Sequence, residues 1–158
     1  MKPARKRNRV EEYDYSLAGS YFVTICTAEK QILFGTVVGA TVLGRPHVDL
    51  TPLGKMVEDA INYYNENDTE VSFDCFVVMP NHVHAIISIQ PDAGDRGRSP
   101  LQYVVRRLKS YVTKQAGFSP WQKGFHEHII RNQRSYDKIY EYIENNPITW
   151  KEDCYFAE

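Results

Sequence analysis

Cysteine is scarce in this chain, and long apolar runs are absent. The three cysteines, Cys26, Cys75 and Cys154, lie far apart in no CxxC spacing, which argues against a disulfide framework and favours a reducing compartment. No apolar run approaches the roughly 20 residues that a membrane helix requires. The basic N-terminus has no apolar segment behind it, so we expect no signal peptide. The sequence therefore predicts a cytoplasmic protein without a membrane partner.

Nothing in the sequence divides the chain into parts. Its 158 residues are 42% hydrophobic and 25% charged, as in an ordinary globular domain. There is no internal repeat and no long linker. We therefore predict a single domain over residues 1–158, in which residues 1–15 form a basic N-terminal arm.

Charge is unevenly distributed, although the net charge is only −1. Residues 96–134 contain nine Lys or Arg and one acid, and residues 2–9 add five more basic side chains. Residues 49–74 reverse the sign, with seven acids against one lysine. Such asymmetry favours a polyanion as partner. The alternative is that the basic runs are only solvated helix faces, and the residues alone leave both open.

The residue pattern predicts strands and helices in the order β-β-α-β-β-α-β-α. Strands are expected at 21–28 and 31–39, which form a hairpin, and then at 70–79, 82–90 and 124–131. Helices are expected at 51–67, where Thr51 is the N-cap and Pro52 the first helical residue, and then at 101–116 and 135–147. This order favours an antiparallel sheet of the α+β class, with ferredoxin-like topology as the leading candidate.

Two histidines stand one residue apart in "MPNHVHAII", inside a run that otherwise predicts a buried strand. Side chains alternate along a strand, so His82 and His84 point to the same face and form a ready pair of metal ligands. The alternative is that each imidazole is simply hydrogen-bonded on a half-exposed face. The pair by itself favours neither interpretation.

The last predicted helix carries groups that would complete a metal site. Its apolar stripe has core spacing and consists of Tyr136, Ile139, Tyr140 and Ile143. Tyr142 and Asn146 lie off this stripe, one turn apart on one flank. The Asn146 amide oxygen is a hard ligand for a divalent ion, and the Tyr142 phenol is a candidate nucleophile. A bound metal ion would stabilise in-line attack of the phenol on a phosphodiester, although most helix-flank tyrosines are structural.

Three segments in this order, "MPNHVHAII", "WQKGFHEHIIRN" and "YIENNP", resemble the single-tyrosine HUH transposases, and most closely the REP-associated tyrosine transposases. The resemblance runs from the first predicted strand to Pro147. It implies a ferredoxin-like HUH endonuclease that binds single-stranded or hairpin-forming DNA in the bacterial nucleoid. It also implies cleavage with Mg²⁺ or Mn²⁺, a 5′-phosphotyrosine intermediate and the ability to form a homodimer.

The resemblance also implies roles for single residues. His82 and His84 match the metal pair, Asn146 the further ligand and Tyr142 the nucleophile. The supporting motif, structural or DNA-contacting, matches Trp121, Gln122, Glu127, His128 and Arg131. His126 and His128 form a second HxH pair that could serve as the metal pair instead, but the Met-Pro-Asn turn before His82 favours the first.

Basic side chains are the candidates for DNA binding, and we expect most of them to contact phosphates. They are Lys2, Arg5, Lys6, Arg7 and Arg9 in the arm, Arg96 and Arg98 in a polar Gly-rich loop, Arg106, Arg107 and Lys109 in the basic helix, and Arg131.

Three other functions compete with this hypothesis. A nucleotide hydrolase with a His-x-His-x-His triad would need a histidine where the chain has Ile86. A relaxase or replication initiator would place its tyrosine before the histidines, at Tyr13, Tyr15 or Tyr21, whereas the pairing of Tyr142 with Asn146 favours the transposase order. A DNA-binding protein that keeps the fold without cutting stays open.

Overall fold

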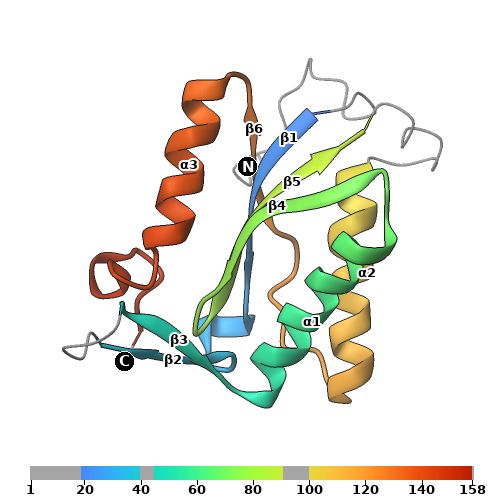
Figure 1. Ribbon diagram of the computed structural model, residues 1–158. Helices are drawn as coiled ribbons and strands as arrows, with labels where there is room; N and C mark the ends of the chain where they lie inside the picture. The colour runs from blue at the N-terminus through green and yellow to red at the C-terminus, as the bar shows by residue number, and fades with distance from the viewer. Residues whose placement is uncertain (1–18, 40–44, 91–99, 158) are drawn as a thin grey trace, which may run out of the picture.

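The computed structural model describes residues 19–39, 45–90 and 100–157. Four strands form one antiparallel sheet in the order β4-β5-β1-β6 (Figure 1). They are β1 (Gly19–Cys26), β4 (Val71–Val78), β5 (His82–Ile89) and β6 (His126–Ile130). Helices α1 (Pro52–Asn67) and α2 (Pro100–Ala116) cover one face, and α3 (Gln133–Asn145) lies on the other. The four strands with α1 and α2 follow a β-α-β-β-α-β order, so the predicted ferredoxin-like α+β fold is confirmed.

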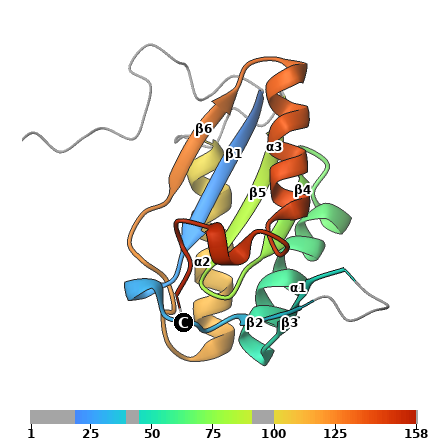
Figure 2. The ribbon, with the colours of Figure 1, turned by 90° about the vertical axis from the view of Figure 1, so that its left-hand side faces the viewer.

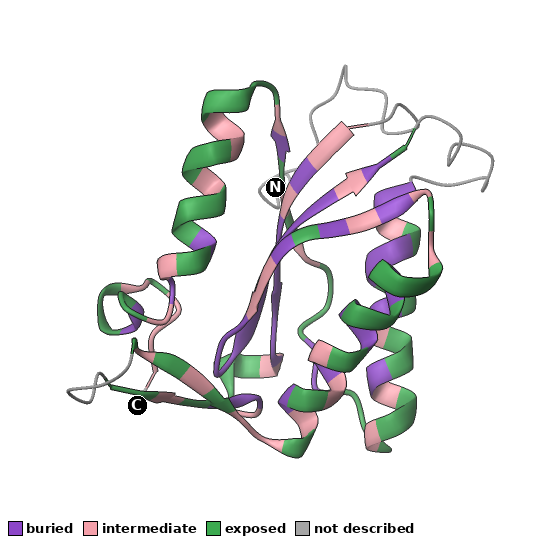
Figure 3. Cartoon of the chain, in the orientation of Figure 1, coloured by how far each residue is buried: buried purple, intermediate pink, exposed green. Residues whose placement is uncertain are grey.

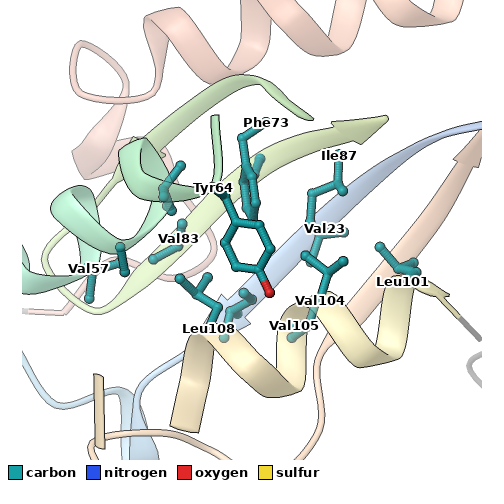
Figure 4. Packing of buried hydrophobic residues seen from close by; sticks show 14 of the residues in the cluster. Val23, Val57, Tyr64, Phe73, Val83, Ile87, Leu101, Val104, Val105 and Leu108 are labelled. Atoms are coloured by element: carbon teal, nitrogen blue, oxygen red, sulfur yellow. The ribbon is translucent and has the colours of Figure 1, made fainter. Parts of the chain in front are cut away.

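The main core lies between the sheet and the pair α1 and α2. Alternate residues of the central strands, such as Val23, Val83 and Ile87, meet the apolar stripe of α2 (Figure 4). The α3 side has only a small buried cluster, of Cys75, Ile86 and Ile143. Most of α3 is accordingly exposed or half-buried (Figure 3). The sheet thus has one thickly covered face and one thinly covered face, and the candidate site lies on the second.

Helix α1 begins as the sequence predicts. Thr51 is its N-cap, and the side-chain oxygen of Thr51 accepts a hydrogen bond from the Gly54 N–H at 3.1 Å. Pro52 occupies the first helical position, where no N–H is needed. Gly54 is buried against Phe34, and a Cβ atom at Gly54 would clash with the Phe34 carbonyl oxygen. This close approach brings the start of α1 onto the chain segment that follows β1.

The expected hairpin between 21–28 and 31–39 is wrong. Strand β2 (Gly35–Val38) pairs instead with β3 (His47–Leu50), a strand that the sequence pattern did not predict, in a separate two-stranded sheet. Strand β1 pairs with β5 on one side and with β6 on the other. Both edges of β1 are therefore occupied, and no place beside it remains for β2.

A local turn explains where β2 goes. After β1 the short 3-10 helix η1 (Ala28–Lys30) places Glu29 and Lys30 at a φ of 55°, which turns the chain out of the main sheet. The N–H groups of Leu33 and Phe34 then donate to the Pro80 carbonyl, at 3.0 and 2.9 Å. The segment before β2 is thus bonded to the turn between β4 and β5.

The remaining predicted elements are present with shifted ends. Helix α3 starts earlier than expected, because the Asn132 side chain caps it by accepting from the Ser135 N–H at 2.8 Å. The assignment of Tyr140 to the apolar stripe is wrong, since this side chain is 36% exposed. A second 3-10 helix, η3 (Trp150–Glu152), follows α3. Within the described ranges, no helix has the length and apolar character needed to cross a bilayer.

Candidate metal centre

A tight turn places the first histidine. The Met79 N–H donates to the His82 carbonyl at 2.8 Å, which closes the turn through Pro80 and Asn81. The Asn81 side chain donates through Nδ2 to the backbone carbonyls of Tyr155, at 2.7 Å, and Lys30, at 3.3 Å. Its Oδ1 atom is then left to accept from Nδ1 of His82 at 2.8 Å. The proton of His82 therefore sits on Nδ1, and the lone pair of Nε2 is available to a ligand.

Strand β5 places the second histidine on the same face. The two imidazole centroids are 4.4 Å apart, and both side chains are almost completely buried. Nδ1 of His84 lies 2.9 Å from the Thr24 hydroxyl on β1. Each ring is thus held through Nδ1, which is the usual arrangement behind metal-binding histidines.

The end of α3 brings an amide and a carboxylate to the histidines. Asn146, the C-cap residue, is fully buried, and its Nδ2 donates to Oδ2 of Asp153 at 2.9 Å. Oδ1 of Asp153 accepts from the Tyr155 N–H at 2.8 Å. One ligand atom from each of His82, His84 and Asp153 lies within 4.8 Å of the others. These three groups could hold a metal ion.

The donor set fits a divalent cation because its buried acceptors lack partners. Nε2 of His82, Nε2 of His84 and Oδ1 of Asn146 are buried and have no hydrogen-bond partner. A buried polar atom without a partner costs free energy. Imidazole nitrogens together with amide and carboxylate oxygens suit Mn²⁺, and the oxygens suit Mg²⁺. A cation would satisfy all of these atoms at once.

Burial keeps the imidazoles neutral. It lowers the pKa of His82 to about 4, against an opposing effect of the Asp153 carboxylate, and lowers the pKa of His84 to about 3. Burial alone would raise the pKa of Asp153, but hydrogen bonds from Tyr155 and Asn146 outweigh it and lower that pKa. Near neutral pH the site therefore presents two neutral imidazoles and a carboxylate, the protonation states that metal ligation needs.

Aromatic rings surround the histidine pair. Tyr155 lies 4.6 Å from His82 between ring centroids, and Phe22 lies 5.2 Å from His84. Tyr142 lies 5.4 Å from His84, and its hydroxyl donates to Oδ2 of Asp153 at 3.4 Å. Burial and the nearby Asp153 charge raise the pKa of Tyr142. The phenol is half-exposed, so it can meet a substrate while it stays beside the ligand atoms.

The structure therefore brings together the four residues that the sequence selected, His82, His84, Tyr142 and Asn146. It adds Asp153, which the sequence analysis missed. Asp153 follows a short 3-10 helix and has no motif around it, so no sequence signal pointed to it.

Comparison with known proteins was made for sequence and for fold. No protein-family model matches the chain. A Haemophilus influenzae protein described as uncharacterised is 35% identical over an alignment that covers 98% of this chain and 94% of that protein. The chain belongs to the family of this protein. A REP-associated tyrosine transposase from Escherichia coli is 32% identical over 84 residues, which cover 52% of this chain and about half, 48%, of the relative.

A solved structure of a REP-associated tyrosine transposase bound to a REP hairpin is similar to this one, with a TM-score of 0.62. It is 24% identical in sequence, and the match covers 89% of this chain and 74% of that one. The chain has the fold of a REP-associated tyrosine transposase. The resemblance predicted from the three motifs is thus confirmed: the chain is similar to a REP-associated tyrosine transposase in sequence over about half of its length, and it shares the fold of another.

The supporting motif of this transposase fold mostly holds a loop in place. Trp121 is buried, and its Nε1 donates to the Lys109 carbonyl at 3.1 Å. The Lys109 ammonium donates to the carbonyls of Gln122 and Gly124, both at 2.9 Å, and burial lowers the pKa of Lys109. Glu127 is half-buried on β6. The loop from α2 to β6 is therefore fastened to α2 by residues of the motif.

The other predicted DNA contacts lie on the surface or outside the described residues. Arg106, Arg107, Gln122 and Arg131 are exposed. Arg106 also lines a cavity of about 570 Å³ with Lys123, between α2 and the loop that follows it. The structure does not describe the positions of Lys2, Arg5, Lys6, Arg7, Arg9, Arg96 and Arg98.

Two alternatives from the sequence can be compared with the structure. The second HxH pair, His126 and His128, is exposed on β6, and the metal-ligand cluster found among the described residues does not include it. Tyr21, a candidate nucleophile in the relaxase order, is fully buried in the core on the other face of the sheet. The structure thus favours the first HxH pair and speaks against Tyr21 as a nucleophile.

Proposed function

We propose that the chain is a metal-dependent tyrosine transposase that cleaves and rejoins single-stranded or hairpin DNA through a 5′-phosphotyrosine intermediate. The observation that carries the proposal is the convergence of three buried acceptors without partners, Nε2 of His82, Nε2 of His84 and Oδ1 of Asn146, beside the half-exposed Tyr142. Hairpin DNA is proposed as the substrate because the solved relative is bound to a REP hairpin.

The residues would divide the work as follows. A divalent ion held by His82, His84, Asn146 and Asp153 would neutralise charge on the scissile phosphate. Tyr142 Oη forms the new bond to phosphorus while the bond from phosphorus to the 3′ oxygen breaks, and the phenol loses one proton as the 3′ oxygen gains one. Asp153 orients the phenol by accepting its hydrogen bond. Because the phosphotyrosine keeps the bond energy, attack by a second 3′ hydroxyl can rejoin the strand.

Adduct formation tests the reaction. Labelled single-stranded DNA that carries a hairpin is incubated with Mn²⁺ or Mg²⁺, and covalent protein–DNA adduct is measured on a denaturing gel. We expect Tyr142→Phe and His82→Ala to lower its yield by about 1000-fold or more. Tyr140→Phe is the matched control, since Tyr140 is an exposed tyrosine on the same helix. An adduct that survives Tyr142→Phe would assign the nucleophile elsewhere, and DNA binding without any adduct would indicate a non-cleaving DNA-binding protein.

Metal binding is measured separately by calorimetry with Mn²⁺. We expect His82→Ala to abolish binding and Asp153→Asn to weaken it by about 10- to 100-fold. Tyr142→Phe and the exposed-acid control Asp137→Asn should bind as the unaltered protein does. Unchanged affinity in Asp153→Asn would remove Asp153 from the metal centre.

A further inference from the structure

Among the residues that the structure describes, no helix covers β6 and the N-terminal half of β1 on the sheet face that carries the histidine pair. Seen from this side, α3 lies over β4 and β5, and the segment after α3, which includes η3, crosses in front of the C-terminal end of β1 (Figure 2). Thr24 and Cys26 are accordingly buried, whereas β6 runs beside these elements with no described helix over it (Figure 2). Phe22 on the N-terminal half of β1 is only half-buried. The uncovered part of the face therefore begins at the edge of the candidate metal centre.

The second HxH pair lies on this uncovered part. In the register of β1 with β6, Thr24 is opposite His126 and Phe22 is opposite His128. Thr24 is also opposite His84 on its other side. Residues directly opposite in an antiparallel sheet share a face, so His126 and His128 point to the same side as the metal pair. Two strand spacings, about 10 Å, separate β6 from β5, which is far beyond a metal–ligand bond.

Helix α3 supplies the other border of this surface. Tyr142 points at Phe22 and His84. Lys138 is exposed one turn earlier on the same flank of the helix. A cationic side chain thus stands along the helix border, while His126 and His128 stand along the strand border.

The aromatic ring of Phe22 lies between α3 and β6 at the base of this surface. This ring is 5.2 Å from His84 and meets Tyr142 edge-on at 6.1 Å. Aromatic rings flanked by cationic groups are the usual means of holding single-stranded nucleic acid, because bases stack on the rings and phosphates meet the cations. We name the four residues Phe22, His126, His128 and Lys138 the β6 strip.

We propose that the β6 strip binds the single-stranded nucleotides that flank the scissile phosphate. The proposal rests on the proposed function, since it takes the strand to be the one cut at the metal centre. Two observations select this occupant. The strip is continuous with the site through Phe22 and Tyr142, and its one charged residue, the exposed Lys138, is basic, which suits a polyanion. His126 and His128 then position the substrate and leave the metal to the first pair.

Binding without cleavage tests the strip. In a Tyr142→Phe background, the dissociation constant of a fluorescent oligothymidylate is measured by anisotropy in the presence of Mn²⁺. We expect the double change His126→Ala and His128→Ala to weaken binding about tenfold and Phe22→Leu to weaken it about fivefold or more. Phe22→Tyr keeps an aromatic ring and should restore binding, which separates stacking from a folding defect. His47→Ala, an exposed histidine on β3, is the control.

The outcomes separate this proposal from the proposed function. If the strip variants bind the oligothymidylate as tightly as their parent, the strip proposal is overturned, whether or not the unaltered protein forms an adduct. If binding depends on the strip while no adduct forms, the strip stands and the cleavage reaction fails. A loss of Mn²⁺ affinity in the histidine double variant would make β6 part of the metal centre and would also overturn the proposal.

Discussion

Each histidine of the candidate metal centre has one buried ring nitrogen, Nε2, without a hydrogen-bond partner, which costs free energy in the metal-free protein. Neither ring can take up a proton easily, because burial disfavours the charged form. The unfolded chain has no such restriction. The stability of the metal-free protein should therefore depend on pH through these two residues.

The expected direction follows from the pKa values. Burial lowers the pKa of His82 to about 4 and of His84 to about 3, whereas an unfolded histidine has a pKa of about 6.5. Between these values the unfolded chain binds protons that the folded chain does not, so the free energy of unfolding falls as pH falls below 6.5. Between pH 7 and pH 5 we expect a loss of about 2 kcal/mol for each imidazole, measured by urea unfolding in EDTA.

The variant His84→Gln separates the contribution of His84 to this pH dependence from that of other titrating groups. In His84→Gln, the difference in the free energy of unfolding between pH 7 and pH 5 should fall by about half. Asp153 titrates below this window, since its pKa is lowered. An undiminished pH dependence in His84→Gln would show that His84 is not held neutral by the fold.

At the scale of the elements, Phe34, the residue just before β2, links α1 to the turn that precedes His82 and His84. Gly54 of α1 packs on the Phe34 carbonyl, and the Phe34 N–H donates to the Pro80 carbonyl at 2.9 Å. Pro80 lies two residues before His82. The start of α1 therefore packs against Phe34, which is hydrogen-bonded to the turn before the histidines.

Gly54→Ala tests this link. At an exposed helix position this change would stabilise the protein. At Gly54 the new Cβ would clash with the Phe34 carbonyl oxygen, so we expect a loss of about 2 kcal/mol in the free energy of unfolding, measured with urea. Gly39→Ala is the control, because a Cβ there meets nothing within 4 Å. A stabilised Gly54→Ala protein would mean that α1 does not pack closely on Phe34.

Only part of the fold and of the candidate site could be predicted from the sequence. Helix α1 was predictable because Thr51 and Pro52 mark its start locally, and the pairs His82–His84 and Tyr142–Asn146 each lie within one element at a fixed spacing. The place of β2 was not predictable, because the segment before it is bonded to the distant Pro80. Strand β3 was not predictable either, because it forms by pairing with β2. Asp153 was missed for the same reason, since only the return of η3 across the sheet brings it to the histidines.

At the scale of the molecule, charge is divided between the two helices that cover one face. The acid-rich segment 49–74 includes α1, whereas α2 and the following loop are basic. On the loop side of α2, Arg106 and Lys123 line the same cavity. A polyanion would therefore meet attraction on one side of this layer and repulsion on the other.

Salt dependence tests this division. The affinity of the Tyr142→Phe protein for single-stranded DNA should fall with salt, with a slope of about −0.7 per phosphate contact in a plot of log affinity against log salt concentration. We expect a slope steeper than about −2, and Arg106→Ala should make it shallower by about 0.7. Lys55→Ala, in the acid-rich segment and paired with Glu58, should leave it unchanged. Affinity that is indifferent to salt would contradict the basic face.

The candidate site has two parts that should differ in local stability: His82 and His84 on strand β5, and Tyr142 and Asp153 near the C-terminus. Strand β5 is bonded on both edges, to β1 and β4, and seven of its eight residues are buried, so the amide protons of His82 and His84 should exchange with solvent only when the whole domain opens. Tyr142 and Asp153 come from a thinly packed helix and a short C-terminal turn, which can open on their own at lower cost. Tyr142 and Asp153 should therefore separate from the histidines and return many times before the sheet unfolds once. The two histidines stay in place throughout, so the site can re-form around them.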